Sequence, residues 1–199
     1  MTALNRFGLL APVVALSLSG CGLNSVPTAE EQVNAAWGNL QSEYQRRADL
    51  VPNLVSTVKG YAQQEKSVLV EVTEARAKAT SIQLSGDDLS DPAKVKAFSD
   101  AQGQLGSSLG RLLATFEAYP NLKSNENFLT LQSQLEGTEN QIRVARRDYN
   151  ETVRAYNTRI RTFPDAIGAK VFYGAKPKVP FEAASGADAA PKVDFNTTG

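Results

Sequence analysis

Histidine is absent from this 199-residue chain, and cysteine occurs once, at Cys21. Without histidine the chain cannot build a Ser-His-Asp or Cys-His catalytic group, nor the Glu-x-x-His metal motif of helical bundles. One cysteine cannot form an intrachain disulfide, and it supplies too few thiolates for a structural zinc or iron–sulfur site. We therefore predict no catalytic residues and no metal, and a domain that is stabilised by packing alone.

An excess of charge of either sign is also missing, because 21 basic residues balance 21 acidic ones. A nucleic-acid interface needs a basic patch or stripe, so we expect no nucleic-acid partner. The hydrophobic content of 42% over this length is enough for one domain with a real core.

The N-terminus is built like an export signal. Arg6 precedes a charge-free apolar run over residues 7–18, and small residues then lead to Cys21 in the tetrapeptide LSGC. This pattern resembles a bacterial lipoprotein signal, in which the cysteine is acylated and becomes the first residue after cleavage. We therefore predict a signal peptide over residues 1–20, a tether over residues 21–27, and a covalent lipid on Cys21 as the only attached group.

An uncleaved transmembrane anchor is the alternative, because the uncharged stretch is about as long as the shortest spanning helices. Gly22 follows Cys21 where an acidic residue marks inner-membrane retention in Gram-negative lipoproteins. By that resemblance we expect an outer-membrane anchor on the periplasmic side.

Apolar residues repeat in alternating steps of four and three from residue 33 to residue 82. Thirteen of these fifteen positions are apolar, where composition alone gives about six. The positions are Val33, Trp37, Leu40, Tyr44, Arg47, Val51, Leu54, Val58, Tyr61, Glu65, Val68, Val72, Ala75, Ala79 and Ile82. Such a seam predicts coiled-coil-like packing against partner helices. We expect one long helix from an N-cap at Thr28 to residue 82, kinked at Pro52.

Two further long helices follow the same periodicity. Asp91 and Pro92 are typical of the N-cap and first-turn proline of a helix that ends near residue 119. Ser124 is the expected N-cap of a third long helix, which Phe163-Pro164 ends or bends. A short fourth helix is expected over residues 166–172. The prediction is all-α: an elongated antiparallel bundle over residues 28–174, followed by a disordered tail over 175–199 with one candidate anchor at 179–181.

Short motifs are spread over most of this region. They are W-x-x-L-x-x-x-Y-x-R-R-x-D-L-V-P-N-L (37–54), V-K-G-Y-x-x-x-E (58–65), Y-P-x-L-K (119–123) and L-Q-x-x-L-E-x-T-E-N-x-I (131–142), with Tyr149-Asn150, Tyr156-Asn157 and Phe163-Pro164 beyond them. In combination they resemble the LemA family of bacterial proteins over about residues 33–182. The resemblance implies a membrane-tethered antiparallel helical bundle. Many members carry an uncleaved N-terminal transmembrane helix. This chain differs from them in its LSGC motif at Cys21, and it therefore resembles a lipoprotein-type member of the family.

Polar residues at seam positions are the first candidate functional residues. Arg47 and Glu65 stand where apolar residues are expected, and a buried charge needs a partner. Glu139, Asn140 and Arg143 on the third long helix are the candidate partners. These residues either fix the register of the helices or bind another protein.

A charged cluster and two repeated pairs complete the candidates. Arg46, Arg47 and Asp49 beside the proline form a candidate anion or partner site, against a surface charge cluster as the alternative. Glu139 and Arg143 are expected to pair along one helix. The pairs at 149–150 and 156–157 are explained by packing, with the Asn amides bonding neighbouring helices.

These observations favour a non-enzymatic, membrane-anchored scaffold or adaptor for other cell-envelope proteins. The expected partners are the membrane lipid, reached through the anchor, other envelope proteins, and further copies of this chain in a homo-oligomer. Self-assembly that organises the membrane is the alternative function, since heptad seams can pair with copies of themselves. An envelope hydrolase that uses carboxylates is a third, weaker reading.

Overall fold

The computed structural model describes residues 24–60 and 65–182, and these are all-α. Four long helices make up the body: α2 (Ser25–Lys59), α3 (Lys66–Ser81), α4 (Pro92–Phe116) and α6 (Glu126–Arg159). Three short elements join or follow them: η1 (Asp88–Ser90), α5 (Pro120–Lys123) and α7 (Asp165–Val171). In this part of the chain no helix has both the length and the apolar character to cross a bilayer.

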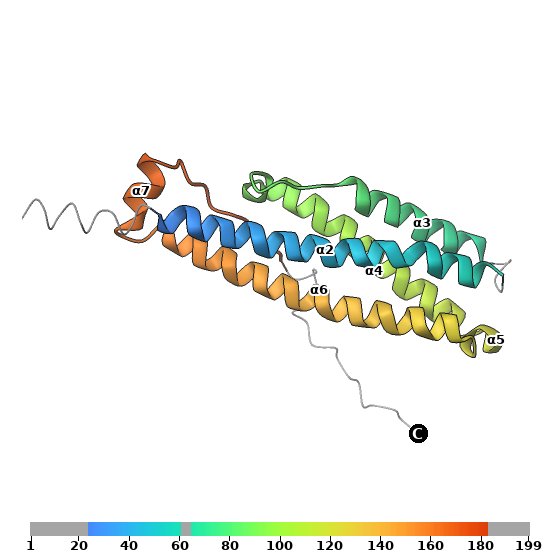
Figure 1. Cartoon of the computed structure of the whole chain (residues 1–199). Coiled ribbons are helices and arrows are strands. Elements are labelled where there is room, and N and C mark those ends of the chain that lie inside the picture. The colour runs from blue at the N-terminus through green and yellow to red at the C-terminus, as the bar shows by residue number, and fades with distance from the viewer. Residues whose placement is uncertain (1–23, 61–64, 183–199) are drawn as a thin grey trace, which may run out of the picture.

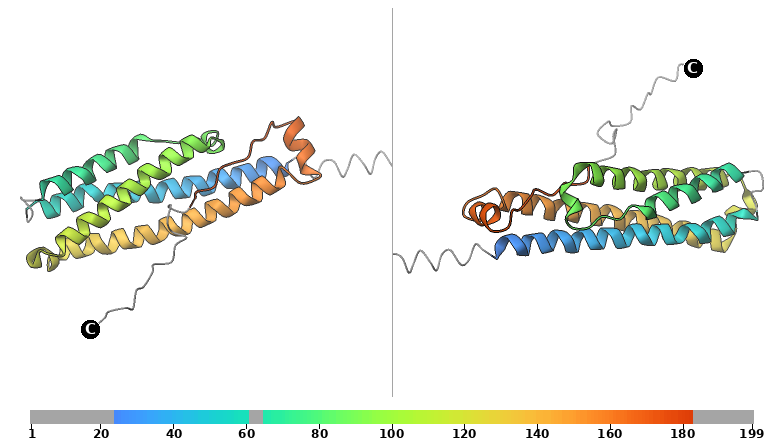
Figure 2. Two further views of the ribbon diagram at one scale, coloured as in Figure 1. Left: turned by 180° about the vertical axis from the view of Figure 1, so that it is seen from behind. Right: turned by 90° about the horizontal axis from the view of Figure 1, so that it is seen from above.

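The long helices form an elongated bundle of two antiparallel pairs (Figure 1). α2 and α6 lie side by side along their whole length, and α3 and α4 form the second pair against them, as both further views show (Figure 2). α7 lies at the end where α2 begins, and α5 lies at the opposite end. After α7 the chain returns along α6.

The predicted single helix over residues 28–82 is wrong, because the chain reverses after Lys59 and the bundle has four long helices rather than three. The apolar repeat gave no sign of this turn, because the repeat positions are buried on both sides of it: Val58 in α2 and Val72 in α3 are fully inaccessible to solvent. Gly60 lies directly after α2, and a glycine is a common signal for the end of a helix. The prediction passed over it because the apolar repeat continues across it without a break. The seam is confirmed from Val33 to Val58, where every predicted position is buried, while Tyr61 lies outside the described residues.

Pro52 lies inside α2 and cannot donate to the carbonyl of Ala48. Arg76 of α3 fills that vacancy: its Nε donates to the Ala48 oxygen at 2.8 Å. The proline therefore frees an acceptor that ties α2 to the helix folded back against it.

Helix ends were predicted with mixed success. Asp91 caps α4, since its carboxylate accepts from the amides of Ala93 and Lys94. Thr28 is not a cap, because α2 begins three residues earlier. Asn125, not Ser124, caps α6 and accepts from the Phe128 amide at 3.1 Å.

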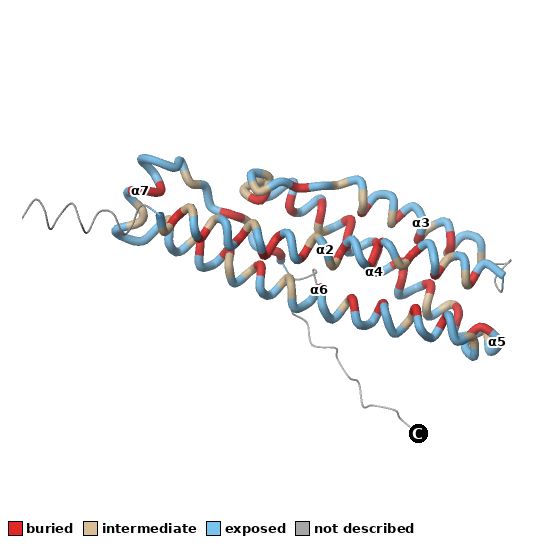
Figure 3. The backbone as a smooth tube through the Cα atoms, in the orientation of Figure 1, coloured by how far each residue is buried: buried red, intermediate tan, exposed pale blue. Residues whose placement is uncertain are grey.

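Two apolar cores follow one another along the bundle, and Figure 3 shows the buried residues on the facing sides of the helices. The first, at the α7 end, contains Trp37, Leu40, Phe98, Tyr149 and Phe181. The second, at the α5 end, contains Leu54, Leu105, Leu112, Phe116 and Leu135. A buried polar group separates the two cores, and it includes Arg47.

The tail prediction needs a correction for residues 175–182. This segment, which we call the strap, lies against the bundle in extended conformation, and Phe181 is only 4% exposed within the first core. The candidate anchor at 179–181 is thus confirmed. The remainder of the predicted tail, like Cys21 and the predicted signal and tether up to residue 23, lies outside the described residues.

Candidate functional site

The polar layer between the two cores is built around Arg47 of α2. Its side chain is 4% exposed, and its Nη1 donates to Oε1 of Glu139 at 2.7 Å. Its Nη2 donates to the backbone oxygen of Gln102 at 2.7 Å and to Oε1 of the same residue at 2.9 Å. Gln102 in turn donates from Nε2 to the Ala79 oxygen at 3.1 Å. One guanidinium therefore connects α2, α4 and α6 directly, and α3 through Gln102.

The surroundings of Arg47 fit its size and charge. The guanidinium carbon lies 5.2 Å from the centre of the Tyr44 ring, a cation–π distance. Burial raises the pKa of Tyr44, against the opposing charges of Arg146 and Arg47. Gly106 of α4 gives the arginine room, because a Cβ there would lie 3.3 Å from Nη1. Glu139 is 46% exposed, so water reaches the acidic partner but not the arginine.

The predicted partnership of Arg47 with Glu139 is confirmed, while the predicted Glu139–Arg143 ion pair is absent from the described residues. Arg143 is exposed and donates instead to Asn140 Oδ1 at 3.1 Å. Both of these side chains therefore lie outside the polar layer.

The charged cluster beside Pro52 does not converge on one site. Arg46 and Asp49 are exposed, and Asp49 accepts from Gln45 Nε2 at 2.7 Å. Arg47 is buried in the bundle instead. The helix therefore divides the predicted anion site between solvent and core.

Glu65 lies at the start of α3, where the hairpin returns. It accepts from the Tyr119 hydroxyl at 3.3 Å, at the far end of the bundle from α7. Partial burial and the Glu65 carboxylate together raise the pKa of Tyr119. Glu65 therefore belongs to a different contact from Arg47.

Two asparagines of α6 hold the backbone of the strap. Asn150 donates from Nδ2 to the Phe181 oxygen at 2.9 Å and accepts the Phe181 amide at 2.8 Å. Asn157 makes the same pair of bonds with Lys178, at 2.8 and 2.9 Å. Seven helical residues span about 10.5 Å, and three extended residues span about 10 Å. The asparagine spacing therefore matches the strap in register.

Other side chains complete the hydrogen bonding of the strap. The Tyr149 hydroxyl donates to the Val179 oxygen at 2.9 Å, and Nη2 of Arg146 donates to the Glu182 oxygen at 2.8 Å. The Val179 amide donates to the oxygen of Leu89 in η1 at 2.8 Å. Like an edge strand, the strap is paired, but its partners are mostly side chains of a helix.

Phe181 is the apolar anchor of the strap. Its ring stacks on Trp37 with 5.8 Å between centroids and 15° between planes, and it meets Tyr149 edge-on at 5.4 Å. The guanidinium of Arg146 lies 5.7 Å from the Phe181 ring centre. The strap therefore contributes directly to the first core.

Lys178 is the polar anchor, with a side chain only 4% exposed. Its Nζ donates to the Gly86 oxygen at 2.9 Å and pairs with Glu30 Oε1 at 2.9 Å. It also lies 6.0 Å from the ring centre of Tyr156, whose pKa is raised to about 12 by burial and by Glu30. The strap thus joins α6 to α2 and to the α3–α4 connection.

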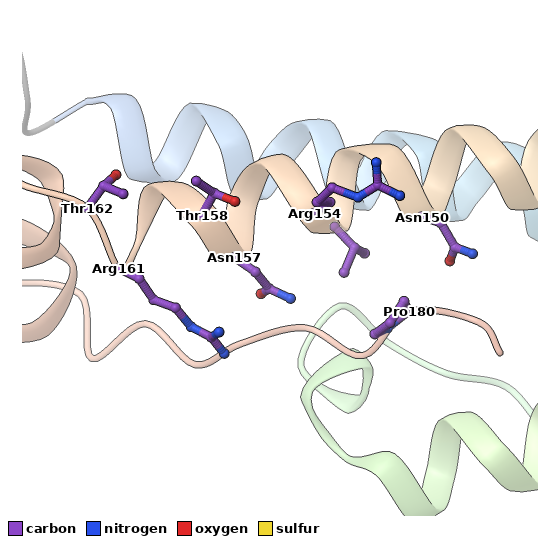
Figure 4. A pocket seen from close by; sticks show the side chains of 8 residues that line it. Asn150, Arg154, Asn157, Thr158, Arg161, Thr162 and Pro180 are labelled. Carbon is purple, nitrogen blue, oxygen red and sulfur yellow. The ribbon is translucent and has the colours of Figure 1, made fainter.

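The predicted bonding of the Asn150 and Asn157 amides to neighbouring helices is wrong, because both amides bond the backbone of the strap. Their heptad spacing was visible, but their partner is a segment without periodicity. The same face of α6 bounds a shallow polar pocket, in which Pro180 lies opposite Asn150 and Asn157 (Figure 4). Arg154 and Arg161 also line it, and their guanidinium groups lie well apart rather than converging on a common point.

Comparisons with known proteins identify relatives of this chain. The model of the LemA family matches residues 36–195. Magnetosome protein MamQ 2 of Paramagnetospirillum magneticum is 27% identical over 178 residues, which cover 81% of this chain and 65% of that protein. Magnetosome protein MamQ of Magnetospirillum gryphiswaldense is 26% identical over 180 residues, covering 82% of this chain and 65% of that one.

Protein LemA of Metamycoplasma hominis is 26% identical over 140 residues, covering 70% of this chain and 60% of that protein. The chain thus spans less than two thirds of the length of these relatives. The family match itself covers most of the chain, including the polar layer and the strap. This chain therefore belongs to the LemA family.

Proposed function

We propose that this LemA-family protein is a non-enzymatic, lipid-anchored scaffold or adaptor for other proteins of the cell envelope. The observation that carries the proposal is how the buried and half-buried polar side chains are used. Arg47 and Gln102 bond neighbouring helices, and Asn150, Asn157 and Lys178 bond the strap. The interior polar groups thus hold the rod together, and interaction with partners falls to its outer surface.

A short link to the anchor supports the same proposal. α2 begins at Ser25, four residues after Cys21. Four extended residues reach at most about 14 Å, so a lipid on Cys21 holds this end of the bundle close to a membrane. Similarity to relatives named as magnetosome proteins supports a role within a larger assembly.

The anchor is tested by metabolic labelling with a clickable fatty acid. We expect label on the full chain and none on Cys21→Ser, because the thiol is the attachment point. Equal labelling of both would contradict the lipoprotein anchor, as would an unlabelled wild type.

The adaptor role is tested by proximity labelling from the full anchored chain. The control is a reporter that carries residues 1–27 of this chain on an unrelated folded domain, so that the anchor is the same and the bundle is missing. We expect a reproducible set of envelope proteins that the bundle labels and the reporter does not. Identical sets would contradict the adaptor role, and labelling confined to other copies of this chain would favour self-assembly.

A further inference from the structure

Exposed apolar side chains are concentrated at one end of the bundle. Of the eight large hydrophobic residues that are exposed in the described chain, five belong to residues 163–173, which comprise α7 and its flanks. These are Phe163 (82% exposed), Ile167 (56%), Val171 (68%), Phe172 (68%) and Tyr173 (44%). A cluster of exposed apolar side chains is typical of a surface that binds another protein or a membrane.

α7 presents these residues because its sides are reversed relative to an ordinary surface helix. The small residues Gly168 and Ala169 are buried, and Ala169 packs in the first core. Ile167 and Val171, four residues apart and therefore on one side of the helix, are exposed. The small residues thus seat α7 on the bundle, and its bulky residues are left for an outside partner.

This surface lies where the chain enters the bundle. Arg159, at the end of α6, donates from Nη1 to the Ser25 oxygen at 3.2 Å, and α7 follows α6 at the same end (Figures 1 and 2). Cys21, the predicted membrane attachment point, precedes the start of α2 by only four residues. A membrane that holds Cys21 therefore also lies close to α7.

The charges around α7 are mostly positive. Residues 159–176 contain four basic residues and one acidic residue, Asp165, which pairs with Arg159 at 3.6 Å. The other three, Arg161, Lys170 and Lys176, are exposed. Apolar and aromatic side chains flanked by basic ones suit the interface of a bilayer that contains anionic lipids.

We propose that the surface formed by residues 163–173 docks on an anionic lipid bilayer and inserts Phe163, Ile167, Val171 and Phe172 into its interface. This proposal extends the membrane tethering proposed above and does not depend on which group anchors Cys21. Docking at this end makes the long axis of the bundle point out of the membrane plane. The α5 end is then held about 50 Å from the surface, the length of α2.

Quenching by bromine-labelled acyl chains tests the proposal. Full-length Phe172→Trp is reconstituted in vesicles of phosphatidylglycerol and phosphatidylethanolamine, with Leu129→Trp, exposed near the α5 end, as the matched control. Trp37 is buried and gives both variants the same background. We expect the added tryptophan at 172 to shift to shorter wavelength and lose most of its fluorescence, and the one at 129 to keep its fluorescence.

A second variant separates docking from anchoring. Ile167→Glu with Val171→Glu changes exposed positions, so the fold is retained, and we expect quenching at 172 to be lost while fatty-acid labelling of Cys21 is unchanged. Lack of quenching in the labelled Phe172→Trp protein overturns the docking proposal and leaves the anchor standing. Quenching in a protein that takes up no fatty acid supports the docking proposal and overturns the lipid anchor. A blue shift without vesicles, together with a dimer in sedimentation, assigns the surface to a second copy and also overturns the proposal.

Discussion

At the scale of single residues, Arg47 decides how the two cores meet. Its guanidinium reaches Gln102 and Glu139 from inside the bundle, and Arg47 is the only charged residue among the buried residues of α2. A slip of one helix by a turn would leave the charge buried without partners, which costs several kcal/mol. We therefore interpret the polar layer as the device that fixes the register of the helices.

Removing the acidic partner is expected to cost more than removing the arginine. Glu139→Ala leaves a buried cation, and we expect about 1–3 kcal/mol of unfolding free energy to be lost, with water limiting the effect at this half-exposed position. Arg47→Met fills the space and returns Glu139 to solvent, so a smaller loss is expected. Urea unfolding measures both, and an equal, negligible effect would contradict the register role.

Buried tyrosines make stability fall in alkali. Burial raises the pKa of Tyr156 to about 12 and that of Tyr149 further still, whereas both are near 10 in the unfolded chain. The unfolded state therefore loses these protons first, and stability that is complete below pH 10 declines as the pH rises through about 12.

Tyr149→Phe tests this pH dependence. The variant lacks the bond to the Val179 oxygen, so we expect about 1 kcal/mol lower stability at pH 8. Its stability should then fall less steeply than that of the wild type between pH 10 and about 12. Parallel curves in urea titrations over this range would show that the phenol does not ionise on unfolding.

At the scale of elements, the strap and the α2–α3 hairpin are the two features that hold the helices together beyond ordinary packing. Both rest on side chains that bond backbone atoms: Asn150 and Asn157 on the strap, and Arg76 on the carbonyl freed by Pro52. Such bonds join segments far apart in sequence.

A double-mutant cycle tests the hairpin contact. Arg76→Met leaves the Ala48 carbonyl without its donor, and we expect a loss of about 1–3 kcal/mol. In a Pro52→Ala background the new amide at 52 can bond Ala48, so the same change should cost less. A cost independent of the residue at 52 would show that Arg76 does not compensate for the proline.

The strap is tested by Asn150→Asp, which keeps the acceptor for the Phe181 amide but places an anion against the Phe181 oxygen. We expect faster hydrogen exchange at Lys178, Val179 and Phe181, whose amides have defined acceptors, and little change in α2. Asn140→Asp, at an exposed position of the same helix, is the matched control. Unchanged exchange in the strap would contradict its dependence on the asparagines.

The helical elements were predictable because apolar periodicity reports burial directly: Val33 to Val58 face the core as expected. The partnership of Arg47 with Glu139 was also predictable, since a buried charge requires a partner. The turn at Gly60 was missed because two antiparallel helices can continue the same phase. Of the strap, only the anchor at residues 179–181 was predicted, because the asparagines recognise its backbone atoms, which sequence periodicity does not encode.

At the scale of the whole molecule, the features combine into a rod with different ends. The α7 end carries the entry of the chain, the exposed apolar surface and the strap, while the α5 end closes with compact turns. We interpret the protein as a spacer that stands on a membrane and presents its sides and far end to other proteins.

Neutron reflectometry of the full lipidated chain on a supported anionic bilayer tests this account most directly. An upright rod, with α2 along the membrane normal, gives a protein layer about 50 Å thick. A layer of about 20 Å, the thickness of two packed helices lying flat, would contradict it.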